Sequence, residues 1–439
     1  MSSPSRVRLD VLRFAPMRAL LRCAAFPLAL QVAALVFVVW VALSGLGVGV
    51  GMTRAELMTL RKTNLATLVV WGLWWPGMIA VALFFGRMWC TVCPMEALNR
   101  GAQVLARRLG VRQVRLTRFL RAGWITVALY LVIQMLVAGV SMHRMPHYTG
   151  LMTLALLGLA ATAGVVFSDH RSFCVAFCPA SALLSVYGRF TPVQLETRDP
   201  SVCAACATRD CVKAAYRDRL DRRSCPSLLQ PYRRAPSDGC VTCLQCAKVC
   251  PPGNVGPGVV AADATVRACT PLKPFEVAFM LMAFGFVAHE VFAEVKWLDA
   301  FFHAVPEALN ALAPSVPFGW FEAVWFLILF PAGIWTVVTL VARFLGYRGE
   351  LRRLLAAATL GAAPVVAVAH LAKALAKVGF WGGYLPLALR DPRGMETFRQ
   401  ISQKTLQPPA DLWALPVVGW MMLLALLFVV VRTSRACSG

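Results

Sequence analysis

Closely spaced cysteines carry most of the chemistry that this sequence could perform. Residues 240–251 read CVTCLQCAKVCP, which follows the spacing C-x2-C-x2-C-x3-C-P. Thiolates this close together hold an iron–sulfur cluster, because the short turns between them let backbone N–H groups point at the sulfurs. A zinc site needs four ligands from two separate pairs, so zinc does not fit this string. The spacing therefore predicts an iron–sulfur site.

The last cysteine of this run predicts a second cluster, because the fourth cysteine of such a run ligates a neighbouring cluster. Further thiols precede the run along the chain, and one of them, Cys225, is itself followed by proline. We expect two [4Fe–4S] clusters with the ligand sets Cys203, Cys206, Cys211 and Cys250 for one, and Cys225, Cys240, Cys243 and Cys246 for the other. Four residues rather than two separate Cys206 from Cys211, so the first set departs from the usual spacing.

Two more cysteine pairs end apolar segments, and each is followed at once by proline. FGRMWCTVCP contains Cys90 and Cys93, and DHRSFCVAFCP contains Cys174 and Cys178. Both copies share Arg-x-aromatic-Cys and Cys-Pro-x-x-Ala-Leu, which indicates an internal repeat. Four roles are open: a third metal centre, a reversible dithiol–disulfide couple, transient copper binding, or inert burial where prolines stop helices.

Long apolar segments must position these cysteines. The chain has 439 residues, of which 59% are hydrophobic and 15% charged, and its mean hydropathy is +0.65. A soluble globular chain is less apolar and more charged. We therefore expect a polytopic all-α membrane protein with a ferredoxin-like α+β insert. Apolar runs of about 20 residues predict about eight transmembrane helices, near residues 24–46, 64–85, 122–141, 150–168, 275–294, 318–342, 354–379 and 414–432.

The net charge of +23 reflects arginines that are gathered in short stretches between the apolar runs. Such stretches set membrane orientation, so the charge does not indicate nucleic-acid binding. The arginine-rich stretches lie before the first run, after the second, after the sixth and at the tail. This pattern predicts a multi-pass protein in the lipid bilayer of a bacterial inner membrane. Both termini, both cysteine pairs and the insert would then face the cytoplasm.

Four domains follow from this organisation. Residues 1–23 form a basic N-terminal lead, 24–190 a four-helix membrane domain with the repeated Cys-Pro pairs, 191–272 a ferredoxin-like domain with two clusters, and 273–439 a second four-helix membrane domain. An insert of about 75 residues buries little core, so we expect bound clusters to stabilise it.

Two histidines in the last four predicted helices form a second candidate site. His289 and His370 are expected at similar depth on two of these helices, and ionisable residues in spans usually pair or act in function. The site could be a bis-His haem b or a quinone site. Alternatively, these helix ends meet water and their acidic and basic residues pair, namely Glu290, Glu294, Lys373 and Lys377.

A multi-span chain with Cys-Pro pairs at cytoplasmic helix ends, followed by a two-cluster ferredoxin insert, resembles the NapH/NosR-type polyferredoxin membrane proteins. The copper-reducing CcoG proteins of oxidase assembly belong to the same broad group. The resemblance covers roughly residues 25–270 and leaves the last four helices unexplained. It implies electron transfer between the quinol pool or a cytoplasmic donor and a partner redox protein, often a periplasmic reductase.

Two other functions fit the same motifs. One is a metal reductase that turns Cu(II) into Cu(I), or an assembly factor for a respiratory metalloenzyme. The other is a redox sensor whose clusters report the state of the cell. The sequence contains no constellation for bond-making chemistry on an organic substrate, so it leaves open whether the chain is an enzyme.

Overall fold

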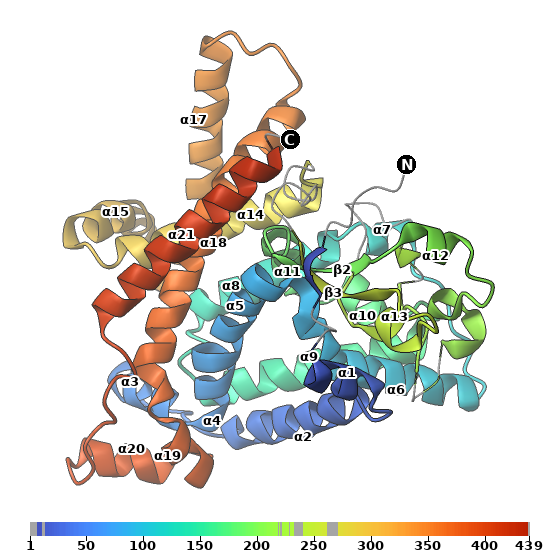
Figure 1. Ribbon diagram of the computed structural model, residues 1–439. Coiled ribbons are helices and arrows are strands. Elements are labelled where there is room, and N and C mark those ends of the chain that lie inside the picture. The colour runs from blue at the N-terminus through green and yellow to red at the C-terminus, as the bar shows by residue number, and fades with distance from the viewer. Residues whose placement is uncertain are drawn as a thin grey trace.

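The computed structural model describes residues 7–10, 14–217, 219, 222–227, 229–231, 240–260 and 271–437. Parts of the predicted N-terminal lead and of the predicted insert lie outside these residues. The described chain is mostly helical, with one small sheet. Figure 1 shows the sheet and the short helices around it at one side, and α15 (Lys296–Leu312) and α20 (Met395–Ser402) at the opposite side.

The N-terminal half contains the two copies of the repeat. The first copy comprises α2 (Leu28–Gly45), α3 (Arg54–Thr63), α4 (Leu65–Thr67), the π-helix η2 (Leu68–Trp74), α5 (Trp75–Phe85), the 3-10 helix η3 (Gly86–Thr91) and α6 (Pro94–Arg108). The second comprises α7 (Arg118–Arg121), α8 (Trp124–Gly139), α9 (Pro146–Val166), α10 (Ser172–Ala176) and α11 (Ser181–Tyr187). Pro94 is the first residue of α6, a position where the missing N–H is not needed. This proline therefore begins a helix rather than ending one.

The insert is built on a three-stranded antiparallel sheet in the order β1-β3-β2, formed by β1 (Val7–Asp10), β2 (Val193–Thr197) and β3 (Val255–Val260). Short helices surround it: α1 (Ala15–Arg22), α12 (Pro200–Ala204), η4 (Asp210–Val212), η5 (Ala214–Tyr216) and α13 (Gln245–Val249). The small apolar core of the insert includes Leu195, Val255 and the side chain of Leu21. The N-terminal segment thus joins the insert through β1 and α1.

The C-terminal half begins with α14 (Pro274–Phe292) and α15. It continues with α16 (Phe318–Val324), the π-helix η8 (Trp325–Leu329), α17 (Phe330–Phe344), α18 (Leu351–Gly382), α19 (Leu385–Arg390), α20 and α21 (Leu415–Cys437). Helix α18 packs against α14, α5 and α21, so it joins the C-terminal half to the first repeat. The largest apolar core forms along these contacts.

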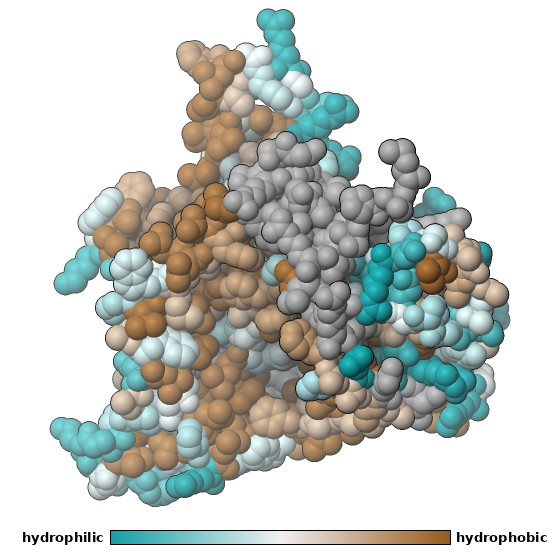
Figure 2. Space-filling model, in the orientation of Figure 1, coloured by the Kyte–Doolittle hydropathy of each residue, from teal (hydrophilic) through white to brown (hydrophobic). Residues whose placement is uncertain are grey.

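Six helical stretches of the described chain are long and apolar enough to cross a membrane: Leu28–Gly45, Leu65–Arg108, Pro146–Val166, Pro274–Phe292, Phe318–Phe344 and Leu351–Gly382. Two shorter apolar helices, Trp124–Gly139 and Pro416–Val431, occupy the other predicted runs. Figure 2 shows apolar side chains gathered over α17, α18 and α21, with hydrophilic ones over α20 and the insert. Exposed Phe344, Leu340 and Trp420 belong to this apolar surface, which suits contact with lipid. The chain is therefore compatible with a multi-pass membrane protein.

Candidate metal centres

The eight insert cysteines form two groups of four, each around its own small cavity. The first cavity is lined by the set that we name set one, Cys203, Cys206, Cys211 and Cys250. The second is lined by set two, Cys225, Cys240, Cys243 and Cys246. The structure thus brings together the same two ligand sets that the spacing predicts.

The backbone of the CVTCLQC loop is shaped to surround an anionic group. Thr242 and Leu244 have positive φ angles of 51° and 59°, and alternation of left- and right-handed residues points successive N–H groups into one concavity. In set one, Asn254 donates from its backbone N to Cys250 Sγ at 3.3 Å and from Nδ2 to Cys203 Sγ at 3.2 Å. Sequence reasoning did not identify Asn254, because asparagine after Cys-Pro-Pro-Gly looks like an ordinary turn residue.

Several buried thiols of the insert need a cation to become thiolates at neutral pH. Burial is the largest cause of the raised pKa values of Cys211 and Cys243, which reach about 11 and about 12. Burial also holds the pKa of Cys246 well above its ordinary value. Iron stabilises thiolates directly, so these buried sulfurs fit a metal site better than they fit free reactive cysteines.

The membrane-side cysteines, which we name set three, are Cys90, Cys93, Cys174 and Cys178. Cys90 lies in η3, Cys93 precedes α6, and Cys174 lies in α10. Cys174 lies in an apolar cluster against which Cys93 and Cys178 also pack, and Cys90 is near enough to influence the ionisation of Cys178. The two copies of the repeat therefore deliver their thiols to one place.

Hydrogen bonds between the repeats hold set three together. Asn99 of α6 donates to Ala160 O and to Ser172 Oγ, both at 3.0 Å. Gln103, one turn further along α6, donates to Phe167 O at 2.8 Å. Gly164 of α9 lies so close to α6 that a Cβ there would come 2.2 Å from Asn99 O. This tight crossing fixes α6 of the first repeat against α9, which leads into α10 and Cys174.

The protonation of set three argues against a dithiol–disulfide couple. Burial raises the pKa of Cys174 to about 11, although the charge of Arg171 opposes the increase. Burial, followed by the charges of Cys174 and Cys90, raises the pKa of Cys178 to about 12. A reactive thiol needs a depressed pKa. Thiols that stay protonated until metal displaces the proton fit a metal centre instead.

Two arginines stand beside set three, one from each copy of the Arg-x-aromatic-Cys motif. Arg171 is 7% exposed, and its Nη2 has no hydrogen-bond partner in the described part of the chain. Burial alone would lower the pKa of Arg171, but the charges of Cys174, Cys90 and Glu96 outweigh it and raise the pKa. Arg87 donates to Ser181 Oγ at 3.2 Å. The motif pointed to these arginines, but their role becomes visible only in the structure.

Direct contacts join the three sets. Thr91, between the cysteines of the first pair, donates to the carbonyl of Thr242, between Cys240 and Cys243, at 3.1 Å. Arg223 of the insert forms a buried ion pair with Glu96 of α6 at 3.0 Å. Set one and set two also adjoin, because Cys203 and Cys211 pack against the same apolar cluster as Cys246. Set two therefore contacts both set one and set three.

A cavity of about 740 Å³ opens beside Cys174. Its wall is strongly basic and draws on both repeats, the insert and the start of α14, through Arg87, Arg115, Arg121, Arg171, Arg189, Arg217 and Lys273. Two carboxylates balance part of this charge, because Glu276 pairs with Arg189 at 2.8 Å and Asp169 pairs with Arg121. The remaining positive charge favours an anionic molecule or an acidic protein surface at this entrance.

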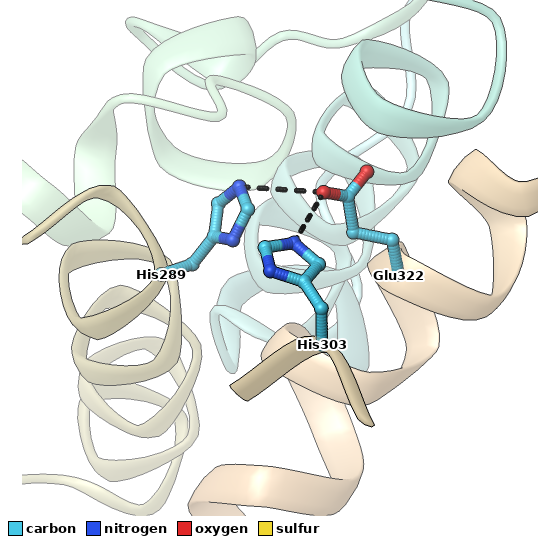
Figure 3. Close-up of side chains that lie close together, drawn as sticks. All are labelled: His289, His303 and Glu322. Carbon is cyan, nitrogen blue, oxygen red and sulfur yellow. Dashed lines mark hydrogen bonds and ion pairs between the residues drawn. The ribbon is translucent and has the colours of Figure 1, made fainter. Parts of the chain in front are cut away.

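The structure gives His289 and His370 different partners. His370 is buried, and its Nδ1 lies 3.1 Å from Tyr187 Oη. His289 instead approaches Glu322 of α16 and His303 of α15 (Figure 3). The acidic and basic neighbours do pair, because Lys373 lies 3.8 Å from Glu290 and 2.5 Å from Glu294. His303 and Glu322 were missed by sequence reasoning.

Comparison with known proteins bears on set three. A family described as a 4Fe-4S binding domain matches residues 67–112 and 151–194. Each matched segment contains one Cys-Pro pair and about half of one repeat, and both end before the insert cysteines begin. An uncharacterized protein of Methanocaldococcus jannaschii is 31% identical over 101 residues, which are 23% of this chain and 36% of that protein. The chain thus spans about a third of the length of this relative. No solved structure matches.

These matches support an iron–sulfur protein of ferredoxin type with two repeats. Together with the apolar helices, they indicate a metal-binding membrane protein of electron transport. The similarity falls on the repeats rather than on the insert, whose CVTCLQCAKVCP run supplied the first indication of iron–sulfur chemistry. Of the four roles open for set three, ligation of a metal centre therefore has the strongest support.

Proposed function

We propose that this chain transfers single electrons in a bacterial inner membrane, between a donor or acceptor on the cytoplasmic side and a quinone or a periplasmic redox partner. Bound [4Fe–4S] clusters would supply one-electron transfer. The contact between set two and set three carries the proposal, because Thr91, between two cysteines of set three, donates a hydrogen bond to the carbonyl of Thr242, between two cysteines of set two. The thiols thus form a continuous series from the insert to the ends of apolar helices.

The protein residues around the sulfurs have distinct roles in this proposal. Sets one, two and three would each hold one cluster. Asn254 donates hydrogen bonds to two sulfurs of set one, which stabilises their negative charge. Arg171 supplies a buried positive charge to Cys174, Cys90 and Cys243. It therefore stabilises negative charge on set two and set three together.

The distribution of charge supports a cytoplasmic insert. Arg100 of α6 donates to the carbonyl of Arg219 in the insert at 2.9 Å, and the basic cavity joins Arg115 of the α6–α7 connection to Arg217 of the insert. Strand β1 places the N-terminal segment on this same side. Arginine-rich connections usually face the cytoplasm. The basic cavity would receive the cytoplasmic partner.

The test uses protein purified without oxygen in detergent. We expect about twelve iron atoms per chain, since three clusters hold four each, and interacting electron paramagnetic resonance signals after reduction. The Cys90→Ser, Cys174→Ser double variant should contain about eight iron atoms, retain the insert signals and reduce a soluble quinone analogue much more slowly. Cys23→Ser, at an exposed lone cysteine, is the matched control. Zinc in place of iron would overturn the proposal, and an unchanged rate in the double variant would remove set three from it.

A further inference from the structure

Three side chains from separate helices converge on the side of the molecule opposite the insert. They are His289 near the end of α14, His303 of α15 and Glu322 of α16 (Figure 3). His303 Nε2 lies 3.1 Å from Glu322 Oε1, and His289 Nε2 lies 3.7 Å from the same oxygen. One donor atom from each residue lies within 4.8 Å of the other two. We name this group the His–His–Glu triad.

The two nitrogen–oxygen distances, 3.1 and 3.7 Å, are close to those between ligands of one metal ion. Metal–ligand bonds of about 2.0–2.1 Å place neighbouring ligand atoms about 3–3.5 Å apart in tetrahedral or octahedral geometry. A hydrogen bond accounts for the 3.1 Å contact, but 3.7 Å is too long for one. Convergence of both imidazoles on a single carboxylate oxygen is what a shared ion would require.

The proton on His303 gives an independent argument. His303 Nδ1 lies 2.9 Å from the backbone carbonyl of Asp299, which only accepts, so Nδ1 carries a hydrogen. Nε2 of a neutral ring then presents its lone pair to a carboxylate oxygen, which also accepts. A cation must therefore lie between His303 Nε2 and Glu322, either as a proton held by the ring or by the carboxylate, or as a metal ion. The Asp299 contact is the kind of support that orients histidine ligands in metal sites.

Packing holds the triad in place without closing it. The ring of Phe326, in the π-helix that follows Glu322, stacks on His289 with centroids 4.8 Å apart and planes at 9°. Gly285, one turn before His289, lies so close to this π-helix that a Cβ would come 1.8 Å from Phe326 O. The three side chains are still 16–22% exposed, which leaves room for further ligands. π-helical turns are frequent at functional sites.

We propose that His289, His303 and Glu322 bind one divalent first-row transition-metal ion. Two imidazoles with one carboxylate suit zinc, iron(II), cobalt(II) and similar ions, and they lack the soft sulfur ligands that copper(I) prefers. His289 lies about 22 Å along the axis of α14 from its first residue, at 1.5 Å per residue. The site is therefore distinct from the thiol sets and adds a metal to the far side of the protein.

The test uses cluster-loaded protein in detergent, titrated without oxygen with Co²⁺, whose visible absorption reports nitrogen and oxygen ligation. We expect one saturable Co²⁺ per chain, displaced by Zn²⁺, with at least a 100-fold loss of affinity in His303→Ala and in Glu322→Gln. Asp299→Asn, which replaces the carboxylate whose Oδ1 lies 3.1 Å from His303 Nδ1, should weaken binding about 10-fold. Glu290→Gln, beside His289 but paired with Lys373, is the matched control and should bind normally.

The iron–sulfur absorption of each variant shows whether it has folded, and it is independent of Co²⁺ binding. The proposal is overturned if the wild-type protein binds no Co²⁺ or Zn²⁺ saturably, in which case the cation is a proton. It is also overturned if cluster-loaded His303→Ala and Glu322→Gln bind Co²⁺ as tightly as wild type. Failure of electron transfer would leave this result unaffected, since the titration needs no turnover.

Discussion

Replacing Arg171 by glutamine should lower the reduction potential of the centre in set three. Arg171 is buried, and its positive charge acts on Cys174 and Cys90. Reduction adds negative charge, so loss of a nearby positive charge disfavours the reduced state. At an effective dielectric constant of about 20 and separations of roughly 5–8 Å, one unit charge contributes roughly 2–3 kcal/mol. With about 2.3 kcal/mol per 100 mV, the expected decrease is roughly 90–140 mV.

The potential would be measured by redox titration of purified protein, followed by electron paramagnetic resonance. Cys174 and Cys90 precede Cys243 among the charges that act on Arg171, so set two should shift by less than set three, and set one least. Arg115→Gln is the control, because Arg115 is exposed in the same cavity and water screens its charge. A potential that changes by less than about 30 mV in Arg171→Gln, or equally in the control, would refute the assigned role, since buried charges cannot be screened so completely.

Three further predictions concern stability and reactivity. Glu96→Gln leaves Arg223 buried without its counter-charge, so the free energy of unfolding should fall by about 3–5 kcal/mol. A thermal melting temperature equal to that of the wild type would contradict this, because it would mean that water screens the pair. Gly285→Ala places a Cβ against the backbone of the π-helix η8. This variant should lower the free energy of unfolding by about 1–3 kcal/mol and weaken Co²⁺ binding. Gly77→Ala, where a Cβ meets open space, should have neither effect. In iron-free protein at pH 8, iodoacetamide should modify Cys206 before Cys178, because hydrogen bonds lower the pKa of the former and burial raises that of the latter to about 12; peptide mass spectrometry giving the opposite order would contradict this.

Local spacing made the thiol sets predictable. A chain that turns every two or three residues must gather its cysteines on one side, so CVTCLQC already defines most of set two. Cys225 was assigned to set two because it is the other insert cysteine that proline follows directly. Length and hydropathy also identified the apolar helices, although in the described chain only six of the eight predicted runs are long enough to cross a membrane and two are shorter helices.

Contacts between helices were not predictable in this way. Counting residues along a helix gives the depth of His289 and His370, but the face that each presents depends on packing. His370 turns toward Tyr187, whereas His289 turns toward His303 and Glu322. Their similar depth had suggested that His289 and His370 could share a ligand. The π-helices were not predictable either, because the hydropathy of a segment does not depend on how many residues form each turn.

The basic N-terminal segment illustrates a different limit. The sequence suggested a separate lead before the first apolar run, and its charge gave no sign of a strand. In the structure β1 pairs with β3 of the insert across about 250 residues of chain. Such pairing depends on an available sheet edge, which is a property of the folded insert and not of the segment itself.

The divided origin of set three would make any metal centre held there a cross-link between the two repeats. Cys90 and Cys93 come from one repeat, and Cys174 and Cys178 come from the other, so neither hairpin alone offers four ligands. By analogy with a disulfide, a link between Cys93 and Cys174 closes a loop of about 80 residues. The lost chain entropy raises the free energy of the unfolded state by about 4.5 kcal/mol. Iron should therefore determine whether the two hairpins unfold together as one cooperative unit or separately.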